Sequence, residues 1–302
     1  MENIDSEAPY PSQKTNPVSV ALSIHWNMLK KNAVLSIVVV VLCVFVLINF
    51  NKEGHLVHGL GYLATMWLCA FIIDVWMQIF PTKAPEVLVK EPKKESFFFI
   101  LFTLLGITFL VMRFMVIKDW EHANHWLKLS LIPLLLFIFP IAIAGYLLIK
   151  NYSVKQLGLR FDKSLLVSLP VAAVTGLTTW LVAPENIHWK EMMKSEGIWA
   201  FLWEGFIVAA LSEEFWRFVG QTRLGILFKN APWALFITVT FWALMHTPKW
   251  YSDGNGDLYG ALCGSARIIP LGLMWSYMIH RTRSIMPSIL VHATNLWGLQ
   301  NP

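Results

Sequence analysis

Long apolar runs alternate with short polar and basic segments along most of the chain. We predict nine membrane-spanning helices, because about 20 consecutive apolar residues cross the hydrocarbon core of a bilayer. Their approximate ranges are 33–50, 56–80, 97–117, 131–149, 164–182, 198–224, 231–246, 258–280 and 284–299. The seventh and ninth runs are shorter than the rest, and both carry candidate site residues. The predicted fold is an all-α polytopic membrane protein with a polar intramembrane cavity between the sixth to ninth spans.

The distribution of lysine and arginine over the predicted loops gives the orientation of the chain. With the N-terminus in the cytoplasm, the inner segments hold 15 basic residues and the outer loops hold 6. Cytoplasmic loops carry an excess of lysine and arginine. We therefore predict a cytoplasmic N-terminus, an external C-terminus and an odd number of spans.

Composition excludes several other classes of protein. Of the 302 residues, 56% are hydrophobic and 14% are charged, against about 25% charged in a soluble domain. The net charge of +5 comes from membrane loops and does not indicate a nucleic-acid partner. The three cysteines, Cys43, Cys69 and Cys263, lie in apolar runs without a Cys-x-x-Cys pair, which is typical of buried apolar residues. A glycine-rich phosphate loop and a His-Glu-x-x-His motif are both absent, so the sequence predicts no cofactor.

The sixth span contains two adjacent carboxylates and an arginine, Glu213-Glu214-Phe-Trp-Arg217. Charges within a membrane helix cost several kcal/mol unless a partner offsets them, and they mark functional sites. On a helix, Glu213 lies about 40° and Glu214 about 60° around the axis from Arg217. One carboxylate can therefore pair with the arginine while the other acts as a general base in a dry site. The simpler alternative is a buried ion pair that only fixes helix packing.

Two histidines and an amide lie in the two short spans. His246 closes the seventh span, and His292 and Asn295 are three residues apart in the ninth, on one helical face. An imidazole and an amide near a developing oxyanion would suit hydrolysis of an acyl group. The plainer interpretations are an interfacial histidine at a helix end and a polar pair that links two helices.

The candidate residues can form one site only if they lie at the same depth in the bilayer. Counted along the predicted spans at about 1.5 Å per residue, Glu213 and His246 differ in depth by roughly 14 Å. They meet only if the glutamate helix is longer than the span, continuing to about Leu227, or if the helices tilt strongly. Elsewhere in the membrane, Asp74 and Arg113 form a candidate pair in the second and third spans.

In this order on consecutive spans, the three elements resemble the CPBP family of intramembrane proteases, which includes the CAAX proteases and the bacteriocin-processing (Abi) proteins. Its pattern is Glu-Glu-x-x-x-Arg, then Phe-x-x-x-His, then His-x-x-x-Asn. Here Glu213-Glu214-x-x-Arg217 and His292-x-x-Asn295 are each one residue shorter, and Trp242 stands where the family has Phe. The resemblance covers roughly Leu157 to the C-terminus.

The resemblance implies an intramembrane endopeptidase that hydrolyses a membrane-associated protein or peptide with an activated water. The resemblance implies that Glu213 is the general base and His246 its partner. It implies that His292 and Asn295 are the oxyanion donors, and that Glu214 and Arg217 form a supporting pair. Because both glutamates lie near Arg217 on the helix, they could exchange roles. It also implies a multi-pass protein of the bacterial inner membrane.

The predicted spans and the range of the resemblance together divide the chain into four parts. Residues 1–32 are predicted to be a cytoplasmic tail, and 33–117 an N-terminal three-helix extension outside the resemblance. Residues 118–163 are expected to hold an interfacial segment, the fourth span and a linker, and 164–302 the CPBP-like catalytic core.

Two alternatives remain open from the residues. One is a zinc-dependent version of the same hydrolysis, in which Glu213, His246 and His292 bind the metal. The other is a protein without catalysis, such as a membrane binding or immunity factor, which the shortened motifs allow.

Overall fold

The computed structural model describes residues 16–81, 89–112, 114, 139–184, 197–294 and 298–300. These residues contain helices and no strand, so the all-α prediction is confirmed. The helices are α1 (Pro17–Lys31), α2 (Ala33–Lys52), α3 (Leu56–Ile79), α4 (Pro92–Val111), α6 (Phe139–Ile149), α7 (Ser168–Val182), α9 (Gly197–Ala200), α10 (Ser212–Phe228), α11 (Ala231–Asp253), α12 (Leu258–Thr282) and α13 (Met286–Thr294). A 3₁₀ turn, Lys163–Val167, precedes α7, and a π-helical stretch, Phe201–Leu211, precedes α10.

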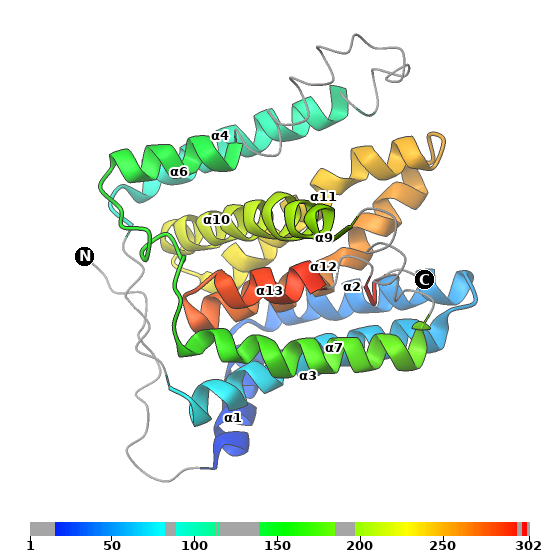
Figure 1. Cartoon of the computed structure of the whole chain (residues 1–302). Coiled ribbons are helices and arrows are strands. Elements are labelled where there is room, and N and C mark those ends of the chain that lie inside the picture. Colours follow the sequence, from blue (N-terminus) through cyan, green and yellow to red (C-terminus); the bar gives the residue numbers. More distant parts are fainter. Residues whose placement is uncertain are drawn as a thin grey trace.

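The helices form three layers (Figure 1). In that view α4 and α6 lie at the top, and α2, α3 and α7 lie toward the bottom. Between them, α10 contacts α4, α6, α11 and α12, while α13 contacts α7 and α12. The predicted site residues in α10, α11 and α13 are therefore carried by the central layer.

The exposed apolar surface indicates that lipid surrounds the helices. Of α2, an almost uninterrupted apolar helix, only a fifth is buried, and Val34, Ile37 and Val41 are each more than 60% exposed. Water does not favour such a surface, whereas lipid does. Within the described residues five helices are long and apolar enough to cross a membrane, and each of the nine predicted ranges overlaps a helix. The protein is an integral membrane protein, while the count of nine spans and the orientation stay predictions.

A tight turn sets the register between α10 and α11. Lys229 ends α10 in a left-handed conformation, and the Asn230 side chain caps α11 by accepting from the Trp233 amide at 3.1 Å. Glu213 lies fifteen residues before the end of α10, and His246 lies fifteen residues after the start of α11. Two antiparallel helices joined by two residues thus bring both side chains to one level.

With this register, Glu213 and His246 lie at the same depth, as a shared site requires. Helix α10 continues to Phe228, one residue beyond the expected Leu227. Helix α11 does not end at His246 as predicted but continues through Pro248 to Asp253, so His246 lies inside the helix. The segment just after His246, which lies beyond the predicted span, is helical as far as Asp253, because a proline near a helix end removes only one backbone hydrogen bond.

Helix α1 lies within the range predicted to be a tail. It packs on α3, and His25 Nε2 lies 2.9 Å from Asp74 Oδ2. Asp74 is fully buried, accepts from the Tyr277 hydroxyl at 2.5 Å, and forms an ion pair in which its Oδ1 lies 2.6 Å from Arg281 Nε. The candidate partner of Asp74, Arg113, lies outside the described residues. Three partners from α1 and α12 already compensate this buried carboxylate.

A tyrosine from α3 is built into the backbone of α12. The Tyr62 hydroxyl donates to the Arg267 carbonyl at 2.6 Å and accepts from the Leu271 amide at 3.1 Å. These two backbone groups are the pair that an α-helix would normally join, and Pro270 lies between them. The inserted hydroxyl satisfies both groups and fixes α12 to α3.

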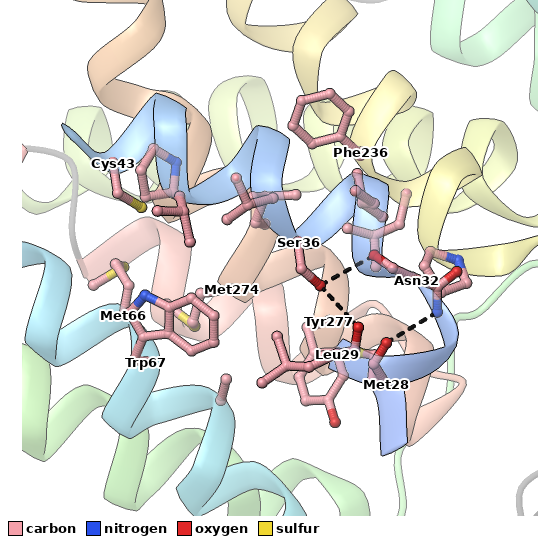
Figure 2. A pocket seen from close by; sticks show the side chains of 18 of the residues that line it. Met28, Leu29, Asn32, Ser36, Cys43, Met66, Trp67, Phe236, Met274 and Tyr277 are labelled. Atoms are coloured by element: carbon pink, nitrogen blue, oxygen red, sulfur yellow. Dashed lines mark hydrogen bonds between the residues drawn. The ribbon is translucent and has the colours of Figure 1, made fainter. Parts of the chain in front are cut away.

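A cavity of about 170 Å³ lies between α1, α2, α3, α11 and α12 (Figure 2). Asn32, Ser36 and Tyr277 lie toward one end, while Cys43 and Trp67 lie toward the other. Ser36 donates to backbone carbonyls of α1 and of the α1–α2 junction. None of the predicted site residues lines this apolar cavity, so it is separate from the glutamate pair.

Gly220 allows α10 to pack closely between α4 and α11. A Cβ there would lie 2.4 Å from the Phe99 ring and 2.7 Å from Thr238 Cγ2. We expect Gly220→Ala to lower the unfolding free energy by about 1–3 kcal/mol through overpacking, measured by thermal unfolding in detergent. The matched control is Gly176→Ala in α7, where a Cβ meets no described atom within 4 Å and helix propensity favours alanine. Equal melting temperatures for the two variants would contradict this packing.

Candidate active site

Glu213 lies at the centre of a group of polar side chains from α10, α11 and α13. Its Oε2 accepts from the Trp242 indole nitrogen at 2.5 Å. Its Oε1 lies 3.8 Å from His246 Nε2, and its Oε2 lies 3.8 Å from His292 Nε2. Both separations exceed a direct hydrogen bond. A water molecule about 2.8 Å from Oε1 and from an imidazole nitrogen fits this spacing.

Hydrogen bonds at Nδ1 set the direction of both imidazole rings. His246 Nδ1 lies 2.9 Å from the Trp242 carbonyl oxygen, and His292 Nδ1 lies 2.7 Å from Glu214 Oε1. Because a carbonyl and a carboxylate only accept, each Nδ1 carries the hydrogen. The two Nε2 atoms therefore face Glu213, with a lone pair in the neutral ring and a hydrogen in the imidazolium.

Glu214 occupies a different environment from its neighbour. Glu214 and Arg217 are both fully buried and form an ion pair three residues apart on α10. Glu214 Oε2 also accepts from the Ser288 hydroxyl at 2.7 Å. Glu213, in contrast, keeps a quarter of its side chain exposed, and His246 keeps 29%. Successive helical residues point about 100° apart, so one carboxylate faces the helix bundle and the other the partly open site.

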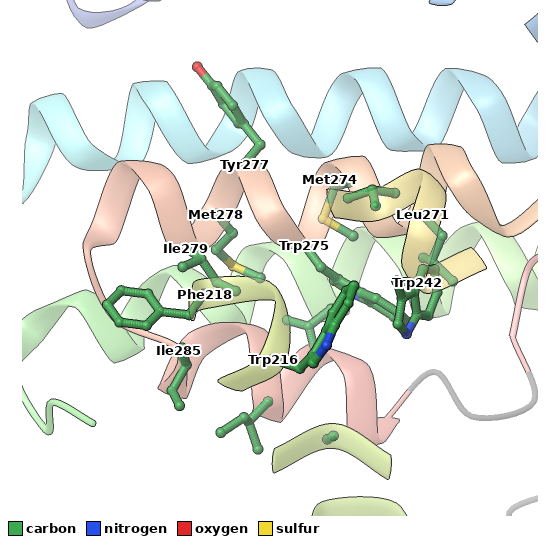
Figure 3. Close-up of a cluster of buried hydrophobic side chains, with 14 of the residues drawn as sticks. Trp216, Phe218, Trp242, Leu271, Met274, Trp275, Tyr277, Met278, Ile279 and Ile285 are labelled. Carbon is green, nitrogen blue, oxygen red and sulfur yellow. The ribbon is translucent and has the colours of Figure 1, made fainter. Parts of the chain in front are cut away.

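Two tryptophans of the buried cluster, Trp242 and Trp275, lie next to the ion pair; Figure 3 shows the two rings. The Arg217 guanidinium lies 4.3 Å from the centroid of the Trp242 ring and 5.0 Å from that of Trp275. Trp275 also stacks on the His292 ring, with centroids 3.9 Å apart and planes 19° apart. The rings exclude water from the ion pair and strengthen its electrostatic attraction.

The structure brings together five of the six residues predicted for the site: Glu213, Glu214, Arg217, His246 and His292. The sixth, Asn295, lies outside the described residues. Sequence reasoning missed the roles of Trp242, Trp275 and Ser288. Two of these had a signal, since Trp242 precedes His246, and Ser288 precedes His292, by one helical turn. Trp275 had none.

The donor groups also bear on the zinc alternative. Within the parts of the chain that the structure describes, no group of three or more His, Cys, Asp or Glu side chains is arranged to hold a metal ion. The two 3.8 Å separations are longer than the about 3.4 Å between ligands of a tetrahedral zinc. Both Nδ1 atoms already donate to an acceptor. A histidine that binds zinc through Nε2 also needs an acceptor at Nδ1, so this feature is compatible with zinc.

Comparison with known proteins gives one family match. Residues 194–297 match a family model described as Type II CAAX prenyl endopeptidase Rce1-like. No curated protein and no solved structure matches the chain. The matched range covers about a third of the chain and contains all six predicted site residues, whereas α1 to α7 lie before it.

The two adjacent glutamates should differ sharply when each is substituted. We expect Glu214→Ala to lower the unfolding free energy by about 3–5 kcal/mol, because it leaves the Arg217 charge buried without a partner. Glu213→Ala removes a partly exposed group and the acceptor of the Trp242 indole, and should cost about 1–2 kcal/mol. Thermal unfolding in detergent measures both values.

A double variant controls for the loss of packing. Glu214→Leu combined with Arg217→Met removes both charges, and we expect it to recover most of the stability that Glu214→Ala loses. Similar melting temperatures for the Glu213 and Glu214 single variants would show that the ion pair is not the main stabilising element of the site.

Proposed function

We propose that the protein is an intramembrane endopeptidase, because residues 194–297 match the family model of the Rce1-like Type II CAAX prenyl endopeptidases. The match bears out the resemblance to the CPBP proteases over this range, and the family is one of membrane proteases. The proposed reaction is hydrolysis of a peptide bond in a membrane-associated protein or peptide.

One observation carries the proposed mechanism. Glu213 is partly exposed between two imidazole nitrogens, each 3.8 Å from one of its oxygens. A water held between Glu213 Oε1 and His246 Nε2 would lose a proton to the carboxylate as its oxygen attacks the peptide carbonyl carbon. The proton would then pass to the amide nitrogen as the carbon–nitrogen bond breaks. Glu213 is thus proposed as the general base and His246 as its partner.

The proposed oxyanion site lies on the opposite side of Glu213. His292 Nδ1 faces Glu214, so Nε2 donates a hydrogen bond only when the ring is an imidazolium. A positively charged donor at Nε2 would stabilise the negative oxygen of the tetrahedral intermediate. Asn295, three residues further along the sequence, is proposed as a second donor. Glu214 and Arg217 would support His292.

The zinc-dependent version of this hydrolysis is a second candidate. It is favoured by the convergence of two Nε2 atoms on Glu213, since imidazole nitrogens and a carboxylate are common zinc ligands. The non-catalytic binding or immunity factor has no comparable support, because a binding surface does not require a partly exposed carboxylate between two imidazoles.

The test of the base is Glu213→Gln in protein reconstituted into lipid vesicles. The probe is a fluorogenic peptide whose C-terminal segment carries a farnesylated cysteine, with an unprenylated membrane-spanning peptide in parallel. We expect the variant to lose at least about a hundredfold in kcat, because glutamine cannot accept the proton. Glu91→Gln, at the partly exposed residue that precedes α4, is the matched control and should keep full activity. Full activity in Glu213→Gln would remove the assignment, and absence of cleavage by the unaltered protein on both probes would favour a binding role.

A chelator separates the two hydrolytic mechanisms. We expect the initial rate to be unchanged after incubation with 1,10-phenanthroline and gel filtration, since the proposed base is the carboxylate alone. If activity is lost and returns on adding zinc, the metal-dependent candidate is correct and the metal-free one is wrong. Metal analysis of the purified protein provides an independent check on the same question.

A further inference from the structure

Trp242 makes a direct contact with the proposed base that a phenylalanine at this position could not make. Its indole N–H donates to Glu213 Oε2 at 2.5 Å. The family pattern has phenylalanine at this place, one turn before the histidine. An indole adds one hydrogen-bond donor to the aromatic ring, and indole nitrogen donates but does not accept.

The orientation of the indole is fixed by its surroundings. Trp242 is 3% exposed and packs against Gly272 of α12, where an added Cβ would lie 2.8 Å from the ring. Its face lies against the Arg217 guanidinium, and its ring is near-perpendicular to Trp275 at 6.0 Å (Figure 3). These contacts come from α10 and α12, so the N–H direction does not depend on α11 alone. The donor is therefore aimed at Glu213 before any substrate binds.

The hydrogen bond divides the two oxygens of Glu213 between two tasks. Oε2 is held by Trp242 and lies toward His292, while Oε1 remains toward His246. A carboxylate without such a donor could rotate and present either oxygen to the water.

We propose that Trp242 is a positioning residue for the reaction: its indole N–H holds Glu213 Oε2, so that Oε1 receives the proton of the water beside His246. This inference rests on the proposed function. The same ring lies on Arg217, so one side chain connects the buried Glu214–Arg217 pair to the proposed base.

The test compares Trp242→Phe with Trp216→Phe in the reconstituted protein. Each removes one buried indole N–H bond, since Trp216 donates to Thr103 Oγ1 at 3.2 Å on the face of α10 toward α4. We expect Trp242→Phe to lower kcat about tenfold to a hundredfold with little change in KM. Trp216→Phe should lower the melting temperature without lowering kcat. Equal kcat values for the two variants would overturn the proposal.

A second measurement separates the N–H from the ring and does not depend on cleavage. Replacing Trp242 by benzothienylalanine keeps the bicyclic ring and exchanges the N–H for sulfur, so packing on Arg217 and Gly272 is retained. This variant should reproduce the kinetic change of Trp242→Phe with a near-normal melting temperature; unchanged kinetics would show that only the ring matters. In ¹⁵N-labelled protein, Glu213→Gln should shift the Trp242 indole N–H resonance, and a resonance that does not shift would disprove the hydrogen bond even if no substrate were cleaved.

Discussion

The neutralisation of Glu214 by Arg217 in a fully buried position is the interaction on which the rest of the site depends. Neither charge could remain in this part of the protein alone, because the cost of removing an ion from water amounts to several kcal/mol. The pair in turn determines its neighbours. Ser288 and His292 of α13 satisfy Glu214, while aromatic rings from α11 and α12 cover Arg217. Three helices therefore converge on one ion pair of α10.

The adjacent glutamates gain different properties from a step of one residue along the helix, which turns their side chains about 100° apart. Glu214 has its oxygens bound by a guanidinium, an imidazole and a hydroxyl and is fully buried, so it does not face substrate or bulk water. Glu213 has one strong donor, the Trp242 indole, and otherwise faces partly open space. A family motif with two consecutive acids thus need not contain two equivalent acids. The ambiguity between them in the sequence comes from their similar angles to Arg217, which describe the helix and not its surroundings.

The helices and most residues of the candidate site could be predicted from the sequence because both follow from local rules. Apolar runs indicated the helices, and the cost of a buried charge pointed to Glu213, Glu214 and Arg217. The sequence could not decide whether His246 lies at the same depth as Glu213, because this depends on where α10 ends. Other features were beyond local rules. The polar, proline-bounded start of the chain gave no sign that α1 would pack on α3, and no pattern linked Asp74 to His25, because partners distant in sequence are chosen by packing.

The N-terminal helices lie outside the family match, yet they hold the two central helices that carry the glutamates and the aromatic rings. On α10, nearly three turns after Glu213, Arg223 is fully buried and pairs with Glu95 of α4 at 3.0 Å. On α12, the Tyr62 hydroxyl of α3 occupies the gap in the backbone beside Pro270, close to Gly272 and Trp275. Arg217 and Arg223 are six residues apart and so point about 240° around α10 from one another. A helix that is paired through charged groups on two faces cannot rotate about its axis without separating a buried charge from its partner. Helix α4 therefore helps to keep Glu213 facing His246, even though α4 contributes no group to the site itself.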